Sequence, residues 1–237
     1  MSPSTTRLPS LSASFPAHNE EGNVEAMIEG LLAALPQVAD RFEIIAVDDG
    51  STDRTFERAT AMAAADPRIR VVRHQTNRGY GAAVWTGLTA GTMEYAFFTD
   101  GDCQFDVREL TELIPMIDRC DAVVGYRVDR QDNAVRILNA HAWNWLIRVL
   151  LHVPVRDVDC AFKLFRREAL RDLEIVSGGA MFSAELLARL VARGARIVER
   201  PVHHLPRESG RSSGGDPRVI ARAFKELIQL YGELRRS

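Results

Sequence analysis

The sequence predicts an α/β protein built on one mostly parallel, Rossmann-like sheet with helices on both faces. Short apolar runs alternate with longer segments whose apolar residues recur every three or four positions. The runs are apolar nearly throughout, as in strands covered on both faces. Polar residues gather where these runs end. With 237 residues, 46% hydrophobic and 26% charged, the chain has the size and composition of a single globular domain.

The expected elements follow in chain order. Strands are expected in the first half at 11–17, 42–47, 69–74, 95–99 and 121–126, with helices at 20–35, 53–65, 81–90 and 108–118. The second half is less regular and predicts strands at 161–167 and 195–205, with helices at 134–153, 182–193 and 218–234. We expect a flexible Ser/Thr/Pro-rich tail at 1–9, the main domain at 10–213 and a helical extension at 214–237.

Bulk properties exclude several classes of protein. A formal net charge of −2 gives no basis for binding nucleic acid. Three cysteines without C-x-x-C spacing fit a reducing, cytoplasmic compartment better than a disulfide framework. No apolar run reaches the roughly 20 residues that span a bilayer, so we expect a soluble or peripheral protein.

Asp100-Gly101-Asp102 is the most informative stretch, because it directly follows the buried strand at 95–99. Two carboxylates two positions apart project from the same side of an extended segment. Oxygen ligands of this kind suit Mg²⁺ or Mn²⁺ bridged to phosphates. The alternative for an isolated pair is an acidic turn that caps the next helix. Polar residues at the ends of three other strands favour a site, because ligands of parallel sheets bind at the carboxyl ends.

Other candidates are weaker when taken singly. Asp48 could accept hydrogen bonds from a nucleobase or ribose, whereas Asp53 is expected to cap a helix. The segment 77–82 lacks the spacing and position of a dinucleotide fingerprint. Arg207 lies in a basic late segment and could reach a diphosphate, although such segments are usually solvated loops. Cys103 is rejected as a nucleophile because its neighbours are carboxylates.

Taken in order, these motifs resemble the family 2 inverting glycosyltransferases with the GT-A fold, and among them the dolichyl- or polyprenyl-phosphate sugar synthases. The resemblance runs from residue 11 to about 213, and its carrying motifs are 15–21, 47–53, 77–79, 100–104, 124–127, Asp157 with 161–163, and Arg207 with Gly210 and Ser212. The sequence departs from the family pattern at His18, Ala140, Ala161 and Ser213.

The resemblance implies a role for each matching residue. The nucleotide sugar would be bound by Pro16, Ala17, His18, Glu20, Asp48, Asp100, Gly101 and Arg207. Asp102 and Gln104 would hold Mg²⁺ or Mn²⁺, and Arg127 and Arg136 would face the acceptor phosphate. Asp100, Asp102 and Arg127 are the expected catalytic residues.

The expected reaction moves a hexose, mannose or glucose, from a GDP- or UDP-linked donor to a polyprenyl or dolichyl phosphate. A phosphate acceptor is already anionic near neutral pH and needs no strong base. One alternative is a family 2 enzyme acting on a hydroxyl, with Glu185 or Asp157 as base; others are a non-catalytic nucleotide-sugar-binding module and a nucleotidyltransferase. We expect the protein to act at the cytoplasmic face of the membrane and to contact the bilayer through Trp143 and Trp145 of the helix at 134–153. The sequence does not decide whether a separate membrane subunit takes part.

Overall fold

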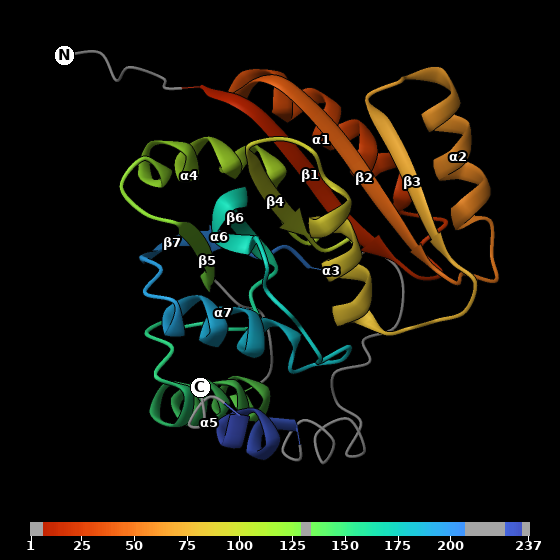
Figure 1. Ribbon diagram of the computed structural model, residues 1–237. Helices are drawn as coiled ribbons and strands as arrows, with labels where there is room; N and C mark the ends of the chain where they lie inside the picture. The colour runs from red at the N-terminus through yellow and green to blue at the C-terminus, as the bar shows by residue number, and fades with distance from the viewer. Residues whose placement is uncertain (1–6, 129–133, 207–225, 234–237) are drawn as a thin grey trace.

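The computed structural model describes residues 7–128, 134–206 and 226–233. Seven strands form one sheet in the order β3-β2-β1-β4-β6-β5-β7 (Figure 1). Their bounds are Leu8–Ala17 for β1, Ala39–Asp49 for β2, Ile69–His74 for β3, Tyr95–Thr99 for β4, Ala122–Val128 for β5, Phe162–Arg166 for β6 and Ile197–His203 for β7. The predicted sheet is therefore present, with every expected strand.

All strands but one run in the same direction. The pairings β1–β2, β2–β3, β1–β4 and β5–β7 are parallel, whereas β6 is antiparallel to both β4 and β5. Because β6 reverses the direction between its neighbours, β5 regains the direction of β4. The carboxyl ends of β1, β2, β4 and β5 consequently share one edge, where the sequence predicts the site.

Helices cover both faces of this sheet. Their bounds are Val24–Val38 for α1, Thr55–Ala65 for α2, Tyr80–Ala90 for α3, Leu110–Ile117 for α4, Ala134–Leu151 for α5, Arg167–Leu170 for α6 and Phe182–Ala192 for α7, with a 3₁₀ turn, η1, at Val107–Glu109. Helix α1 packs with α2 and α4, while α3 packs with α7 on the opposite face (Figure 1). Residues 226–233 form a further helix, and its Leu227 and Leu230 join the same buried cluster as Ile147 and Leu151 of α5.

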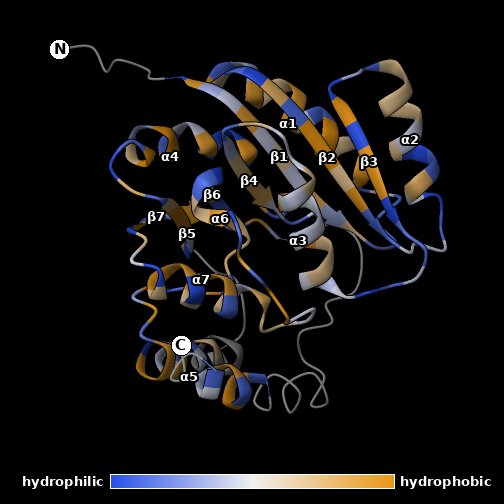
Figure 2. Cartoon of the chain, in the orientation of Figure 1, coloured by the Kyte–Doolittle hydropathy of each residue, from blue (hydrophilic) through white to orange (hydrophobic). Residues whose placement is uncertain are grey.

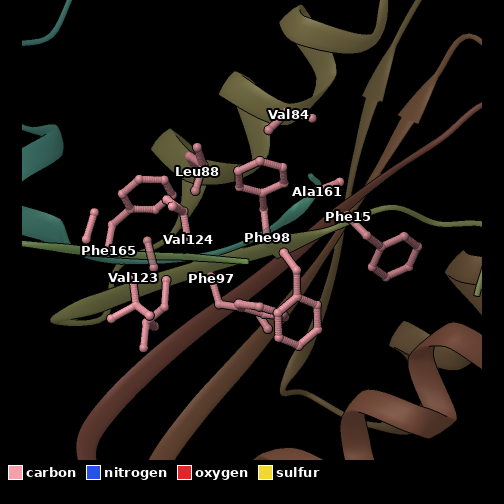
Figure 3. Close-up of a cluster of buried hydrophobic side chains, with 14 of the residues drawn as sticks. Phe15, Val84, Leu88, Phe97, Phe98, Val123, Val124, Ala161 and Phe165 are labelled. Atoms are coloured by element: carbon pink, nitrogen blue, oxygen red, sulfur yellow. The ribbon is translucent and has the colours of Figure 1, made fainter. Parts of the chain in front are cut away.

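The core is divided between the two faces by the alternation along each strand. Phe98 points toward Val84 and Leu88 of α3, whereas its neighbour Phe97 points to the other face (Figure 3). Phe97 meets the Phe162 ring edge-on at 4.8 Å. Hydrophobic residues run along β2, while the loop after β3 is hydrophilic (Figure 2). The buried strands thus form the hydrophobic core, and polar loops lie at the edge of the sheet.

Some element boundaries differ from those expected. Strand β1 begins at Leu8, inside the predicted tail, and α1 begins at Val24 rather than at residue 20. Residues 20–23 instead form a turn, closed by the bond from the Asn23 amide to the Glu20 carbonyl oxygen at 2.9 Å. The first part of the helix expected at 218–234 lies outside the described residues. Within the described ranges, no helix combines the length and apolar character needed to cross a bilayer.

Candidate active site

The loops after β1 and β2 are tied to each other. The His18 ring nitrogen Nδ1 lies 2.9 Å from the Asp49 carbonyl oxygen. The Asn19 amide donates to Ser51 Oγ at 3.0 Å, and the Thr52 amide donates to Asn19 Oδ1 at 2.9 Å. The polar residues predicted at the two strand ends therefore form one connected edge.

The Asp100-Gly101-Asp102 motif lies against the end of β1. A side chain at Gly101 would collide with the Pro16 carbonyl oxygen, so only glycine permits this approach. Asp102 Oδ1 accepts the Gln104 amide at 3.2 Å, across Cys103, which adopts a left-handed backbone conformation with φ of 58°. The structure thus places the acidic motif beside Pro16, near the carboxyl end of β1.

Asp100 is held in an environment that disfavours its charge. Burial, and next the Asp102 carboxylate, raise the pKa of Asp100 to about 7. The Tyr80 hydroxyl, Arg127 and Lys163 partly oppose this shift. Although the residue as a whole is half-buried, its Oδ1 atom is buried and accepts no hydrogen bond from the described part of the chain. Two neighbouring carboxylates with an unsatisfied oxygen form an electrostatic arrangement that a cation would relieve.

A divalent cation fits this donor set. Asp100 and Asp102 supply carboxylate oxygens, which Mg²⁺ and Mn²⁺ prefer. Across the described residues, no group of three or more His, Cys, Asp or Glu side chains is arranged to hold a metal ion. Mg²⁺ sites in proteins commonly complete such a pair of carboxylates with oxygens from water or a bound phosphate.

Gln104 is also connected to the end of β7. Its side-chain Nε2 donates to the Leu205 carbonyl oxygen at 3.0 Å, and the Leu205 amide donates to the Gln104 carbonyl oxygen at 2.8 Å. This engagement leaves the side-chain amide oxygen as the Gln104 donor for a metal. Arg207 lies outside the described residues, as does the side chain of Arg136, so their predicted roles stay predictions.

Asp48 and Asp49 are adjacent in sequence but make different contacts. Asp48 is buried, accepts the Ser51 amide at 3.2 Å and lies 3.1 Å from Arg73 Nε. Asp49 is also buried and accepts the amides of Arg78 and Gly79 at 2.8 and 2.9 Å. Asp49 therefore fixes the loop after β3, a role that the sequence signal at 48–53 did not distinguish.

The glycines of this loop allow close packing between protein segments. A side chain on Gly79 would lie 2.6 Å from the Gly178 carbonyl oxygen, and one on Gly81 would lie 2.5 Å from Phe182 Cβ. That carbonyl also accepts the Gly81 amide at 3.0 Å. These glycines therefore allow a close contact between the loop after β3 and the segment before α7. Tyr80 lies between these two glycines, and its side chain forms a hydrogen bond with Asp100. Tyr80 is thus a residue of the site that the sequence motifs did not predict.

Arg127 makes a bidentate ion pair with Asp157. Its Nε and Nη2 donate to the two carboxylate oxygens at 2.7 Å each, and both side chains are largely buried. Burial opposes charge on both, but the ion pair prevails, so the pKa of Arg127 lies above and that of Asp157 below its ordinary value. The fully buried Lys163 donates to the carbonyl oxygens of Val158 and Cys160 and so supports the loop that carries Asp157.

Glu185 has a structural role in this geometry. It is buried, accepts the amides of Val176 and Ser177 and forms an ion pair with Arg189 at 2.7 Å. Burial raises its pKa, but these hydrogen bonds outweigh burial and keep the pKa below the ordinary value. Both carboxylates named as possible bases, Asp157 and Glu185, are thus engaged and weakly basic.

We expect Mn²⁺ affinity to rise with pH through about 7. A proton on Asp100 competes with a cation beside Asp102, because the pKa of Asp100 is raised to about 7. Competition by one proton weakens binding roughly tenfold for each pH unit below that pKa. Calorimetric titration with Mn²⁺ between about pH 5.5 and 8.5 measures this slope. Asp100→Asn should remove the slope, and a flat profile in the native protein would contradict the assignment.

A comparison with models of known protein families shows which family the chain belongs to. The sequence model described as "Glycosyl transferase family 2" matches residues 12–174, more than half of the chain. The chain belongs to glycosyl transferase family 2. The matched range begins within β1 and extends past β6, and it contains Asp100, Asp102 and Arg127. The resemblance inferred from the motifs is thereby confirmed.

Two curated relatives are named for sugar transfer onto polyprenyl phosphates. The chain is 30% identical over 224 residues to "Dodecaprenyl-phosphate galacturonate synthase" of Rhizobium johnstonii, covering 93% of this chain and 65% of the relative. It is 32% identical over 227 residues to "Undecaprenyl-phosphate 4-deoxy-4-formamido-L-arabinose transferase" of Pectobacterium carotovorum, covering 94% and 66%. The family 2 chain thus spans just under two thirds of these relatives.

The fold matches solved structures. Glucosyl-3-phosphoglycerate synthase from Mycobacterium tuberculosis, in complex with phosphoglyceric acid, superposes with a TM-score of 0.76 at 22% identity, covering 94% of this chain and 80% of that one. A second structure of that enzyme contains Mn²⁺, uridine diphosphate and glucosyl-3-phosphoglycerate and has a TM-score of 0.73. At this identity the likeness establishes the fold, which is the predicted GT-A fold.

Proposed function

We propose that this family 2 protein is a metal-dependent, inverting glycosyltransferase that moves a sugar from a nucleotide diphosphate to a polyprenyl phosphate. The observation that carries the proposal is the acidic motif at the sheet edge, with Arg127 nearby and both candidate bases engaged in ion pairs. The relatives named for polyprenyl-phosphate sugars support the same acceptor class. Glucose or mannose from a UDP or GDP donor remains the expected hexose.

On the donor side, the loops after β1, β2 and β4 would bind the nucleotide diphosphate. The described part of this edge carries six of the residues expected to bind the nucleotide sugar: Pro16, Ala17, His18, Glu20, Asp48 and Gly101. Asp102, with Asp100 and Gln104 beside it, would hold Mg²⁺ or Mn²⁺. Such a cation, when bound, neutralises negative charge that develops on the departing diphosphate. Arg207 is proposed to add a positive charge at the same diphosphate.

On the acceptor side, the chemistry requires a nucleophile but no strong base. A phosphate monoester has a second pKa of about 6 and is largely dianionic near neutral pH. Its oxygen could attack the sugar carbon opposite the leaving diphosphate, which inverts the configuration. Arg127 is oriented by Asp157, and Arg136 is proposed to complete the binding of this phosphate.

A polyprenyl acceptor also sets where the reaction takes place. Exposing its tail to water costs about 0.8 kcal/mol for each CH₂ group, so the enzyme has to come to the lipid. We therefore propose a peripheral protein at the cytoplasmic face of the membrane. A separate membrane subunit that receives the product is compatible with this arrangement.

A donor screen tests the proposal. GDP- and UDP-linked sugars are incubated with a short polyprenyl phosphate and Mg²⁺ or Mn²⁺, and lipid-linked sugar is measured with and without EDTA. We expect product from at least one donor and none with EDTA. Specific binding of donors without transfer or donor hydrolysis would favour a non-catalytic nucleotide-sugar-binding module instead.

Arg136→Ala should separate the two substrates. Loss of a cation that binds the acceptor phosphate should raise the acceptor KM or lower kcat, by roughly tenfold or more for a charge-assisted hydrogen bond of 1.5–3 kcal/mol. Donor affinity should not change. Steady-state kinetics with each substrate varied in turn provide the measurement. Arg119→Ala, which changes an exposed arginine on the turn between α4 and β5, is the control. A collapse of donor affinity with unchanged acceptor kinetics would reverse the assignment.

A further inference from the structure

A basic pocket lies away from the acidic motif, at the carboxyl-terminal end of α5. Its volume is about 440 Å³, and it is lined by Arg148, His152, Pro154, Arg156 and Glu199. Arg148 lies in the last turn of α5 and His152 directly follows the helix, in a left-handed backbone conformation with φ of 54°; both side chains are exposed. Neither the proposed donor site nor the proposed acceptor site uses these side chains.

The two arginines are held in place while their charges remain accessible. Arg148 Nη2 donates to the Val155 carbonyl oxygen at 3.0 Å. The Arg156 guanidinium lies 4.8 Å from the centre of the Tyr126 ring, and its side chain is 65% exposed. Glu199 lies 3.6 Å from Arg156 Nε and is the one acidic side chain of the lining. The lining therefore carries at least one excess positive charge, which suits an anion.

Large apolar side chains are exposed beside this pocket. Trp145 is 64% and Val149 is 47% exposed, and they are one turn apart on α5, next to Arg148. Trp143 behaves differently, because it is partly buried and packs against the core. The expected pair of interfacial tryptophans is therefore reduced to Trp145, with Val149 in place of Trp143.

We propose that this surface docks on a bilayer and that the pocket receives the phosphate of an anionic lipid headgroup. Tryptophan favours the interface between headgroups and acyl chains, and arginines near the surface attract anionic lipids. The surface is connected to the acceptor side, since Arg156 precedes Asp157 and stacks on Tyr126, whose neighbour is Arg127. This inference rests on the proposed polyprenyl-phosphate acceptor, because an enzyme that uses a lipid substrate has to reach the bilayer in which that lipid lies.

Vesicle co-sedimentation of the full chain tests the docking. Vesicles of phosphatidylcholine alone are compared with vesicles that contain about 30% phosphatidylglycerol, at low salt. We expect wild-type protein to bind the anionic vesicles preferentially. Arg148→Gln and Arg156→Gln should each weaken binding about fivefold, and the double variant roughly 25-fold. Trp145→Ser should weaken binding as well, whereas Arg119→Gln, on the turn between α4 and β5, should bind as wild type.

Equal binding of the double variant and wild type would overturn the proposal, as would wild type that ignores anionic vesicles. A thermal shift with inorganic phosphate alone, lost in the double variant and unaccompanied by vesicle binding, would reassign the pocket to a soluble anion. Transfer to a short acceptor in detergent should be unchanged in the double variant. Vesicle binding by a protein that transfers no sugar would refute the proposed function and leave the docking intact.

Discussion

Asp102→Ala is expected to abolish sugar transfer while the fold persists. The carboxylate lies at the sheet edge and is half-buried, so its removal leaves the hydrophobic core unchanged. A bound divalent cation contributes several kcal/mol of charge stabilisation, which corresponds to a loss of roughly 10³-fold in rate. Product formation with saturating donor and Mn²⁺ provides the measurement, and circular dichroism verifies the fold.

Asp118→Ala is the matched control for that variant, since Asp118 is an exposed aspartate that follows α4, outside the described site. Its activity should equal that of wild type. Undiminished transfer by Asp102→Ala in the presence of EDTA would refute the metal site.

Asp157→Ala should lower the free energy of unfolding by about 3–5 kcal/mol. The variant leaves the Arg127 guanidinium largely buried without its bidentate partner, and an uncompensated buried charge is strongly destabilising. Urea unfolding at neutral pH measures the loss. Transfer should fall as well, because the orientation of Arg127 is lost.

Glu112→Ala provides the comparison for stability. Glu112 forms an ion pair with Arg200, and both side chains are largely exposed, at 52% and 41%. Surface pairs contribute about 1 kcal/mol or less, so this variant should unfold close to wild type. An equal decrease in the free energy of unfolding in the two variants would show that the buried Arg127–Asp157 pair stabilises the fold no more than an exposed pair does.

The local sequence was sufficient to predict the strands and the acidic motif. Apolar runs are visible without any knowledge of their neighbours, and Asp100 and Asp102 directly follow such a run. The antiparallel direction of β6 could not be predicted, because it depends on pairing with β4 and β5, which are distant in the chain. Sequence therefore indicated the edge of the site but not the full order of the strands.

The detailed contacts of the site depended on long-range packing. Asp48 and Asp49 are adjacent, yet only the structure shows that Asp49 binds the amides of the loop after β3. Tyr80 reaches Asp100 through the packing of α3, and no motif marks it. Trp143 and Trp145 look equivalent in sequence, but the orientation of α5 packs Trp143 partly against the core and exposes Trp145. A helical pattern fixes the spacing of side chains, whereas the contacts decide which face is buried.

The acceptor preference tests the central claim most directly. Wild-type protein with its preferred nucleotide sugar and Mn²⁺ is given a polyprenyl phosphate or the free polyprenol of the same chain length, and lipid-linked sugar is measured. Because Asp157 and Glu185 are both engaged in ion pairs, the hydroxyl of the alcohol has neither of these carboxylates available as a base. We expect metal-dependent product from the phosphate alone. Equal or faster transfer to the alcohol would contradict the account and establish a hydroxyl acceptor.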